Sequence, residues 1–581
     1  MIVDFPCTEL RGLYDTRPQY KTIEKGLNTW SRLVARVQMS LSAALIVLCL
    51  ASFGLAIGTE SCFLCLSHKE PLVVSTQLAP LHQYELILEY GNQLCNKSFG
   101  VTQLRNCIAR AEQYAHDRVK DLYSEAERHQ SSVTISLDNM CEVLAACATS
   151  CCLSQWDPEQ VHISFGGDNS MIVMWVTQNE LGTPSVAYWP NLSGNVKQNA
   201  AININFSNAT TYTYDSTEWL GYIYTANLTN LSNLTSYDYQ LCGSTSNGFA
   251  CFPTIYNFTA PPVASTAPLT ARFTSSSLLP YIPGETAAIA CIFGDVSTEV
   301  NAVETASSIV TLRKNTTIQL VVNAGDLAYA DGAVSIWDEY FRMIEDFAAY
   351  IPVMTAPGNH ENYYNFASYY ARFTMPVASS NSPSKQYYSF NYEKIHYVSF
   401  SVEEDDGASL LPGAPQRVWL ENDLAQANTE RDVRPWIILF GHRPFYCSSD
   451  SNDCTDVASK LRELLEGLIN QYHVDVVISG HKHNYERTYP VYQSEATSND
   501  YNDPAAPVYY VVGTGGVDKN SDFVDPEPSW SADRDDKYGY LFASAPDSNT
   551  LQLYYLSKSF NVHDSATIQR TTVISTWSFT H

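Results

Sequence analysis

Basic residues are scarce in this chain of 581 residues, and it has no internal repeat or long low-complexity tract. Lys and Arg number 34 against 61 Asp and Glu, which gives a formal net charge of −27. Phosphate backbones are bound by basic surfaces, so this charge argues against nucleic acid as a partner. The apolar content of 45% is typical of a globular chain, and the length suggests three or four domains.

Charged side chains are absent from residues 37–57, a run of 21 residues that is long enough to span a bilayer. Arg32 and Arg36 just before it favour a cytoplasmic tail for residues 1–36. We therefore expect a signal anchor, with a signal peptide cleaved near Gly58 as the alternative. Either interpretation places the remainder outside the cytosol, membrane-bound or secreted.

Glycosylation sequons and cysteines agree with that topology. No sequon precedes the apolar run, and of 15 cysteines only Cys7 and Cys49 lie before residue 58, so the others can pair in an oxidising compartment. The sequons start at Asn96, Asn191, Asn205, Asn208, Asn227, Asn230, Asn233, Asn257 and Asn315.

Residues 58–152 are rich in cysteine and carry apolar residues at helical spacing. The cysteine order resembles that of saposin-B-like domains, and the resemblance implies the pairs Cys62–Cys147, Cys65–Cys141 and Cys95–Cys107. Spacing alone leaves the connectivity of six cysteines open, and Cys151 and Cys152 fall outside the pattern. The segment is then either a lipid-contacting module or a helical stalk.

The pattern becomes β in residues 158–262, where short β-branched and aromatic runs are separated by turn residues. This is typical of a β-sandwich, within which Cys242 and Cys251 are placed to close a loop. Residues 260–268 read as a linker. From residue 270 to 581, apolar strands alternate with helical stretches at residues 336–351 and 457–473, which predicts an α/β domain.

Five apolar runs of this last part end in glycine followed by a residue type that binds metals. Ligands bind beyond the carboxyl ends of the strands in open α/β sheets, so these residues are expected to meet. The set lacks a thiolate and suits hard to borderline metals, not structural zinc. It consists of Asp295, Asp326, Asn359, His442, His481 and His483, and Tyr329 adds a hard phenolate donor suited to Fe(III).

The motifs GD-x-x-Y, GNHE, GHRP and GHKHNYERT, in this order, resemble the purple acid phosphatases among the calcineurin-like metallophosphoesterases. The resemblance covers about residues 158–581 and implies a fibronectin-III-like sandwich before an αββα domain. It also implies a ligand set: Asp295, Tyr329 and His483 for Fe(III), Asn359, His442 and His481 for divalent Zn, Fe or Mn, and Asp326 as the bridge.

Two places depart from the family pattern. The first motif usually reads Gly-Asp-x-Gly, but here Ser297 holds the last position. Some members carry further histidines after the fourth motif, whereas this chain has none between the cysteines of an expected Cys447–Cys454 loop. Protonation of the leaving group would then depend on His360, which alternatively only orients Asn359 and Asp326.

The resulting hypothesis is an acid phosphatase that cleaves phosphate monoesters with a hydroxide nucleophile activated by an Fe(III)–M(II) centre. A second enzymatic interpretation is a lipid phosphodiesterase, because a saposin-like module before a metallophosphoesterase resembles acid sphingomyelinase. A third is a lipid-binding surface glycoprotein without activity. Cys291 is expected to be a buried free thiol with no role.

Overall fold

The computed structural model describes residues 156–191, 203–206, 208–210, 221–246, 248–262, 289–315, 318–519 and 522–571. It also describes two short antiparallel strands, β1 (Leu72–Val73) and β2 (Thr134–Ile135). The chain divides into two units, residues 1–153 and 154–581. The predicted anchor, the saposin-like helices with their cysteines, and Asn96 lie outside the described residues. Among the helices that are described, none combines the length and apolarity needed to cross a bilayer.

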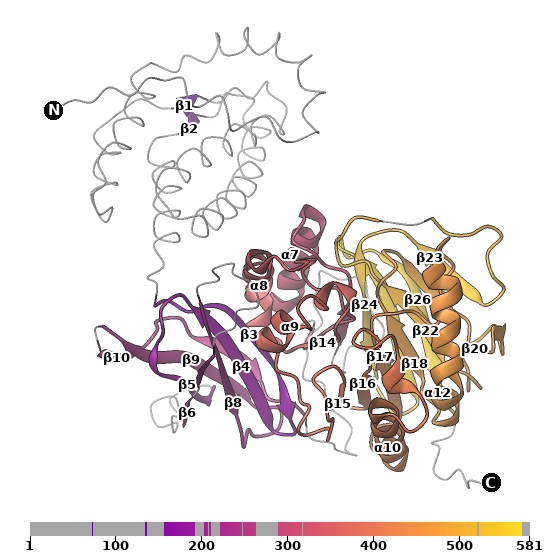
Figure 1. The fold of residues 1–581 in the computed structure, drawn as a ribbon, viewed down its shortest axis with the longest axis horizontal. Helices are drawn as coiled ribbons and strands as arrows, with labels where there is room; N and C mark the ends of the chain where they lie inside the picture. The colour runs from indigo at the N-terminus through magenta and orange to yellow at the C-terminus, as the bar shows by residue number, and fades with distance from the viewer. Residues whose placement is uncertain are drawn as a thin grey trace. The chain divides into compact units, whose positions relative to one another are not determined.

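Residues 159–259 form two facing antiparallel sheets (Figure 1). Every residue of β4 is buried, since one face packs in the sandwich core and the other contacts Ala371 of the next domain. A strand covered on both faces reads as a continuous apolar run. The first sheet comprises β3 (Glu159–Gly167), β4 (Ser170–Thr177), β8 (Tyr222–Leu228) and β7 (Asn208–Thr210); the second comprises β10 (Gly248–Cys251), β9 (Ser236–Thr245), β5 (Gly182–Pro190), β6 (Asn203–Phe206) and β11 (Tyr256–Thr259).

Both expected disulfides within the described residues are present. Cys242 and Cys251 face each other across β9 and β10, so the bond clamps this hairpin. Cys447 and Cys454 close a loop with a sequence separation of 7. Cys291 is a buried free cysteine, as expected.

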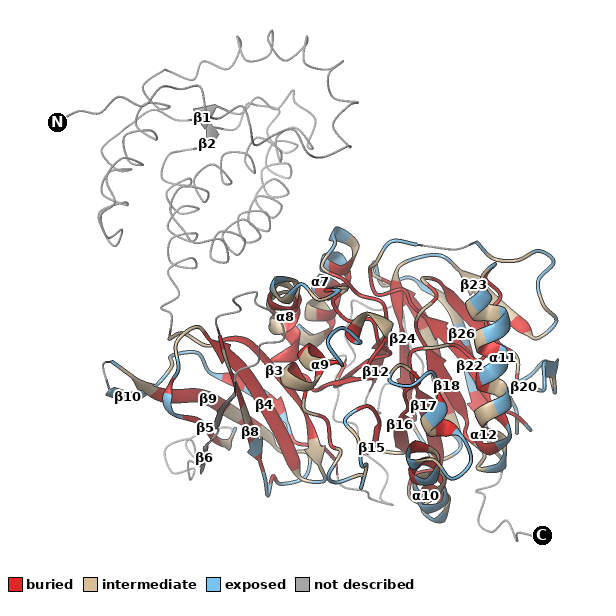
Figure 2. Ribbon diagram, viewed as in Figure 1, coloured by how far each residue is buried: buried red, intermediate tan, exposed pale blue. Residues whose placement is uncertain are grey.

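The α/β domain has two mixed sheets packed face to face. Alternate residues of β17 (Trp436–Phe440) explain the layers, because side chains of a strand point to opposite faces. Ile437 and Leu439 pack with helices α10 (Pro415–Thr429), α11 (Ala458–Leu461) and α12 (Gly467–Gln471), whereas Trp436, Ile438 and Phe440 pack in the core shared with the other sheet. Figure 2 shows this buried core as red strands between partly exposed helices.

Three parallel strands of the six-stranded sheet and two of the seven-stranded sheet precede the predicted site residues. They are β12 (Ala290–Phe293), β13 (Leu320–Asn323) and β14 (Val353–Thr355), and β17 with β18 (Val476–Ser479). Helix α7 (Val300–Lys314) follows β12 in the chain, and helix α8 (Val334–Ala348) follows β13. The other strands of the six-stranded sheet are β24 (Gly539–Ser544), β25 (Thr550–Ser557) and β26 (Val562–Gln569). The other strands of the seven-stranded sheet are β15 (Tyr388–Tyr392), β16 (Ile395–Ser399), β22 (Val508–Val512), β19 (Tyr485–Thr488) and β23 (Ser531–Asp535).

Polar contacts join the sandwich to the α/β domain. Glu159 pairs with Arg342 of α8 at 2.7 Å, and the Tyr239 hydroxyl donates to the Ala349 carbonyl at 2.7 Å. His162 is buried there, with Nδ1 2.8 Å from the Gln160 carbonyl and Nε2 2.9 Å from the Arg372 carbonyl. Burial lowers the pKa of His162 to about 4, so the ring is neutral at pH 7.

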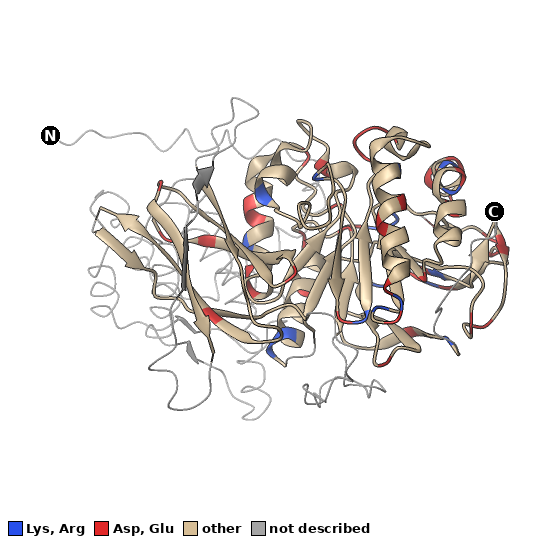
Figure 3. Ribbon diagram, turned by 90° about the horizontal axis from the view of Figure 1, so that it is seen from below, with Lys and Arg blue, Asp and Glu red and all other residues tan. Residues whose placement is uncertain are grey.

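In Figure 3, Lys and Arg stand at isolated positions among Asp and Glu.

Candidate metal centre

The five strand ends meet at one edge of the two packed sheets. Backbone bonds knit the turns together: Asp295 N donates to the Gly325 carbonyl at 3.0 Å, and Gly480 N donates to the His442 carbonyl at 3.0 Å. The backbone N–H of His481 reaches across to Oδ2 of Asp295 at 2.8 Å. Residues separated by nearly 200 positions are thereby placed around one small volume, as the strand-end pattern predicted.

Glycine is required where these turns touch. A Cβ at Gly358 would lie 2.2 Å from Oδ1 of Asp326, and one at Gly480 would lie 2.5 Å from Oδ2 of Asp295. Both distances are far below van der Waals contact, so any larger residue displaces an aspartate of the site.

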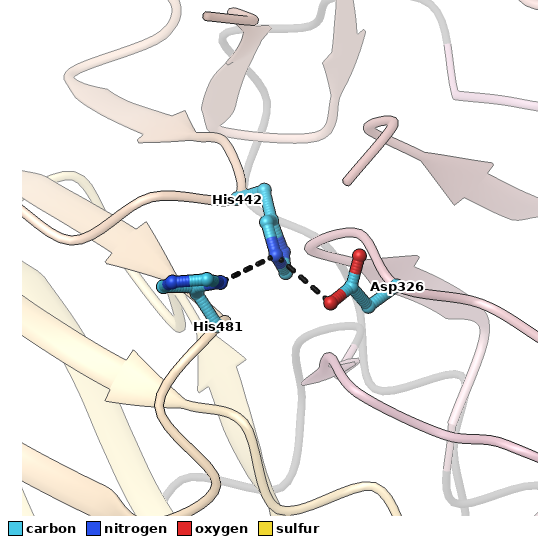
Figure 4. Close-up of side chains that lie close together, drawn as sticks. All are labelled: Asp326, His442 and His481. Carbon is cyan, nitrogen blue, oxygen red and sulfur yellow. Dashed lines mark hydrogen bonds and ion pairs between the residues drawn. The ribbon is translucent and has the colours of Figure 1, made fainter. Parts of the chain in front are cut away.

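The first cluster consists of Asp326, Asn359, His442 and His481. Nε2 of His442 lies 3.1 Å from Oδ2 of Asp326, 3.0 Å from Oδ1 of Asn359 and 3.1 Å from Nδ1 of His481. Figure 4 shows Asp326, His442 and His481 pointing toward one another. Ligand atoms of these three residues lie within 4.8 Å of one another, a spacing that fits a metal ion.

The outer nitrogen of each imidazole in this cluster faces an oxygen. Nδ1 of His442 lies 3.0 Å from the Ala324 carbonyl, and Nε2 of His481 lies 3.2 Å from Oδ1 of Asp453. A neutral imidazole has one N–H, which these oxygens claim, so each inner nitrogen presents a lone pair. The cluster therefore directs two nitrogens, a carboxylate oxygen and an amide oxygen, all electron-pair donors, at one point. A cation fits that arrangement.

The second cluster consists of Asp295, Tyr329 and His483. The Tyr329 hydroxyl lies 3.0 Å from Oδ1 of Asp295 and 2.9 Å from Nε2 of His483. Nδ1 of His483 faces the Asp518 carbonyl at 2.5 Å, so its inner nitrogen also presents a lone pair. A carboxylate, a phenol and an imidazole suit a hard cation such as Fe(III).

Asp326 makes its described polar contacts with the first cluster and with its neighbours. Its Oδ1 accepts from the backbone N–H of His360 at 3.0 Å, while its Oδ2 faces His442. Its carboxylate and those of Asp295 and Glu361 help to raise the pKa of Tyr329, after burial, the largest cause. Its charge therefore acts on both clusters.

The electrostatics of the site favour a positive charge at its centre. Although burial lowers it, the Asp326 carboxylate raises the pKa of His442 to about 10. Burial and then Asp326 raise the pKa of Glu361 to about 8, and this carboxyl also accepts backbone N–H groups from Asp326, Leu327 and Gly358. A proton drawn to His442 occupies the field that a metal ion would neutralise.

His360 stands beside the two clusters. Its Nδ1 lies 2.5 Å from Oδ1 of Asp331, and its Nε2 lies 3.9 Å from Oδ2 of Asp326. Its ring packs on Tyr329 with centroids 4.3 Å apart, and its side chain is 30% exposed. It is therefore close to the centre and open to solvent, which a group that moves protons to a substrate requires.

Several residues around the site escaped the sequence interpretation. Asp331 contacts His360, Glu361 joins the turns after β13 and β14, and Asp453 contacts His481. Asp331 and Glu361 lie within two residues of predicted site residues in the sequence, and this closeness could have identified them as candidates. Asp453 had none, because only the folded loop brings it to His481. Ser297, which replaces the family glycine, has a φ of 71°, so the loop keeps a glycine-like conformation with serine in it.

Comparisons with known proteins match this architecture. Residues 158–260 match the purple acid phosphatase N-terminal domain, residues 290–485 the calcineurin-like phosphoesterase, and residues 506–565 the iron/zinc purple acid phosphatase-like protein C model. Among solved structures, purple acid phosphatase PPD1 from yellow lupin shares the fold with a TM-score of 0.61 and 24% identity, over 73% of this chain and 77% of that one.

Two curated relatives differ in what their names say. Acid phosphatase type 7 of Danio rerio is 35% identical over 413 residues, which cover 66% of this chain and 84% of that protein. Probable inactive purple acid phosphatase 1 of Arabidopsis thaliana is 32% identical over 386 residues, which cover 60% of this chain and 58% of that protein. The phosphatase names and the phosphoesterase match support a phosphoric monoester hydrolase. The chain belongs to the purple acid phosphatase family.

Proposed function

We propose that the chain is an acid phosphatase that hydrolyses phosphate monoesters at a dinuclear Fe(III)–M(II) centre. The observation that carries the proposal is the pair of adjacent clusters in which carboxylate, amide, phenol and imidazole atoms converge at separations of 2.9–3.1 Å. Family membership alone is not sufficient, because a relative bears the name of a probable inactive enzyme.

The donor chemistry supports a division of labour between the clusters. Asp295, Tyr329 and His483 would hold Fe(III), because two of them are hard oxygen donors. Asn359, His442 and His481 would hold the divalent Zn, Fe or Mn, and Asp326 would bridge the two ions. Such a pair of ions supplies Lewis-acid activation of water and neutralisation of the phosphate charge.

The protein's own part in the reaction is to position groups and to move one proton. Asp331 accepts from Nδ1 of His360 and so fixes the orientation of its ring. We assign to His360 the donation of a proton from Nε2 to the departing alkoxide, a step that contributes roughly 10²–10⁴-fold. The main-chain N–H of His360 donates to Asp326 and keeps that carboxylate oriented.

An extracytosolic location is part of the proposal. Asn191, Asn227, Asn230, Asn233 and Asn257 are exposed and therefore accessible to a glycan, which supports the sequon prediction. Asn315 is partly buried and donates to the Thr311 carbonyl, so it is a poorer acceptor. The anchor of residues 37–57, the saposin-like module and its lipid contact remain predictions, as does the absence of a nucleic-acid partner.

The test is a substrate comparison with the full chain at about pH 5. Para-nitrophenyl phosphate and sphingomyelin vesicles are offered in parallel, each with and without a chelator. We expect rapid, metal-dependent hydrolysis of the monoester and little of the lipid diester. Preference for sphingomyelin would replace the phosphatase by the lipid phosphodiesterase, and a metal-loaded chain that cleaves neither would leave the non-enzymatic glycoprotein.

A further inference from the structure

A loop closed by the Cys447–Cys454 disulfide lies against the first cluster. It begins at Cys447, shortly after β17 and His442, and Asp453, just before its second cysteine, opens the one-turn helix η7 (Asp453–Val457). Asp453 accepts from Nη1 of Arg443 at 3.2 Å and from Nζ of Lys482 at 3.3 Å, and its Oδ1 lies 3.2 Å from Nε2 of His481. One carboxylate thus meets two cations and a predicted metal ligand.

Arg443 is a rival partner for the same imidazole nitrogen. Its Nη1 lies 3.2 Å from Nε2 of His481, the same distance as Oδ1 of Asp453 from that nitrogen. An arginine can only donate, and a carboxylate can only accept, so the two neighbours demand opposite tautomers of His481. With Asp453 as partner, Nε2 carries the proton and Nδ1 offers a lone pair to the cluster. With Arg443 as partner, Nδ1 would carry the proton and point it at His442.

The surroundings hold Arg443 where it is. Its Nε and Nη2 donate to Glu403 at 3.0 and 3.3 Å, and the Glu403 side chain is only 5% exposed. Arg443 therefore cannot swing away from His481 without leaving a buried carboxylate unpaired. Of the two described side chains at Nε2 of His481, Asp453 is the one that can accept its N–H, and it is held by Arg443 and Lys482.

We propose that Asp453 is a positioning residue that fixes the metal-binding tautomer of His481 against the competing Arg443, and that it thereby sets the divalent-metal affinity of the first cluster. The inference rests on the proposed function, since it takes His481 as a metal ligand. It gives the disulfide loop, which lacks the further histidines of some family members, a role in metal binding.

The experiment measures Zn²⁺ affinity of the full chain by competition with a chromophoric chelator. Asp453→Asn removes the charge and keeps the size of the side chain, and it should weaken Zn²⁺ binding by roughly 10–100-fold, the usual cost of losing a partner of a metal-bound histidine. The matched control is Asp450→Asn, because Asp450 is an exposed aspartate of the same loop. It should bind Zn²⁺ as the wild type does. The visible absorption of Fe(III) bound by the second cluster is recorded in the same samples. It should persist in all of them, which shows that the domain is folded.

A second variant tests whether Arg443 is the rival donor. Arg443→Met removes the rival donor, so the double variant Asp453→Asn/Arg443→Met should regain most of the Zn²⁺ affinity that Asp453→Asn loses. Affinity within twofold of wild type in Asp453→Asn, an equal loss in Asp450→Asn, or no recovery in the double variant would each overturn the inference and leave the proposed function standing. A wild-type chain that takes up no divalent metal would overturn both.

Discussion

The hydroxyl of Tyr329 lies 2.9 Å from Nε2 of His483, although 154 positions separate the two residues. Burial and the nearby carboxylates, led by Asp295, raise the pKa of this phenol, so it stays protonated without a cation. Ionising it requires a strong positive charge at the point where Tyr329, Asp295 and His483 meet. A change at Tyr329 therefore tests directly whether the second cluster binds Fe(III).

Replacing Tyr329 with Phe should abolish the visible charge-transfer band of the oxidised protein, because a phenyl ring has no oxygen to bind Fe(III). The measurement is the visible spectrum of the purified full chain. Tyr363→Phe is the control, since it removes the same hydroxyl from a tyrosine that is 45% exposed and belongs to neither cluster. A band that survives unchanged in Tyr329→Phe would remove Tyr329 from the iron site.

Replacing His360 with Ala should lower kcat by roughly 10²–10⁴-fold for alkyl phosphates and by much less for para-nitrophenyl phosphate, whose leaving group needs no proton. Asp331→Asn should show the same pattern more weakly, because it disturbs only the orientation of the His360 ring. The measurement is kcat for a series of leaving groups of different pKa. An equal loss for every leaving group would mean that His360 only orients Asn359 and Asp326.

Gly358→Ala should abolish metal binding in the first cluster, because its Cβ would lie 2.2 Å from Oδ1 and 2.4 Å from the backbone nitrogen of Asp326. Gly467→Ala provides the control. A Cβ at this position of α12 meets nothing within 4 Å, and alanine in a helix is favoured by about 1 kcal/mol over glycine. Metal analysis and thermal unfolding of both variants check the prediction. Wild-type metal content in Gly358→Ala would contradict the close packing described at this turn.

Ser297 provides a test of the departure in the first motif. Its φ of 71° suits glycine, whereas a β-branched residue is strained there by about 1–2 kcal/mol. Ser297→Gly loses only the 3.2 Å bond from the Glu299 N–H to Oγ, so it should unfold at or above the wild-type temperature. Ser297→Thr keeps a hydroxyl and should be less stable than the wild type. A glycine variant less stable than the threonine variant would mean that the hydroxyl, not the backbone, decides this position.

His162 makes the junction between the sandwich and the α/β domain sensitive to acid. Its folded-state pKa of about 4 lies below the usual value of 6.5, so the unfolded chain binds a proton more readily than the folded one below pH 6.5. The stability that the neutral ring contributes is present above pH 6.5 and is lost as the pH falls toward 4, by roughly 1–3 kcal/mol at pH 5.

A variant that cannot titrate isolates this contribution. His162→Gln should be less stable than the wild type at pH 7, and the difference in free energy of unfolding should shrink as the pH falls to 5. Denaturant unfolding at both pH values measures it, since the other titrating groups cancel in the difference. A difference that is constant with pH would show that His162 has the same pKa in the folded and the unfolded state.

The sequence was sufficient for features written in local patterns. The strand-end glycines and the residues after them predicted where Asp295, Asp326 and His442 would meet, because parallel strands of one domain end at the same edge. The sandwich strands were predicted from short β-branched and aromatic runs, and β17 from a continuous apolar run. Asp453 could not be predicted, since its contact with His481 depends on how a disulfide loop folds back. The same holds for Glu361, whose three backbone bonds exist only once the turns are assembled.

The most direct test of the two-metal site is the metal content of the purified full chain, measured by elemental mass spectrometry beside His481→Ala. We expect two metal ions per wild-type chain, one of them iron, and loss of the divalent ion with retention of iron in His481→Ala. A wild-type chain without bound metal, or a His481→Ala variant with the full wild-type content, would contradict it.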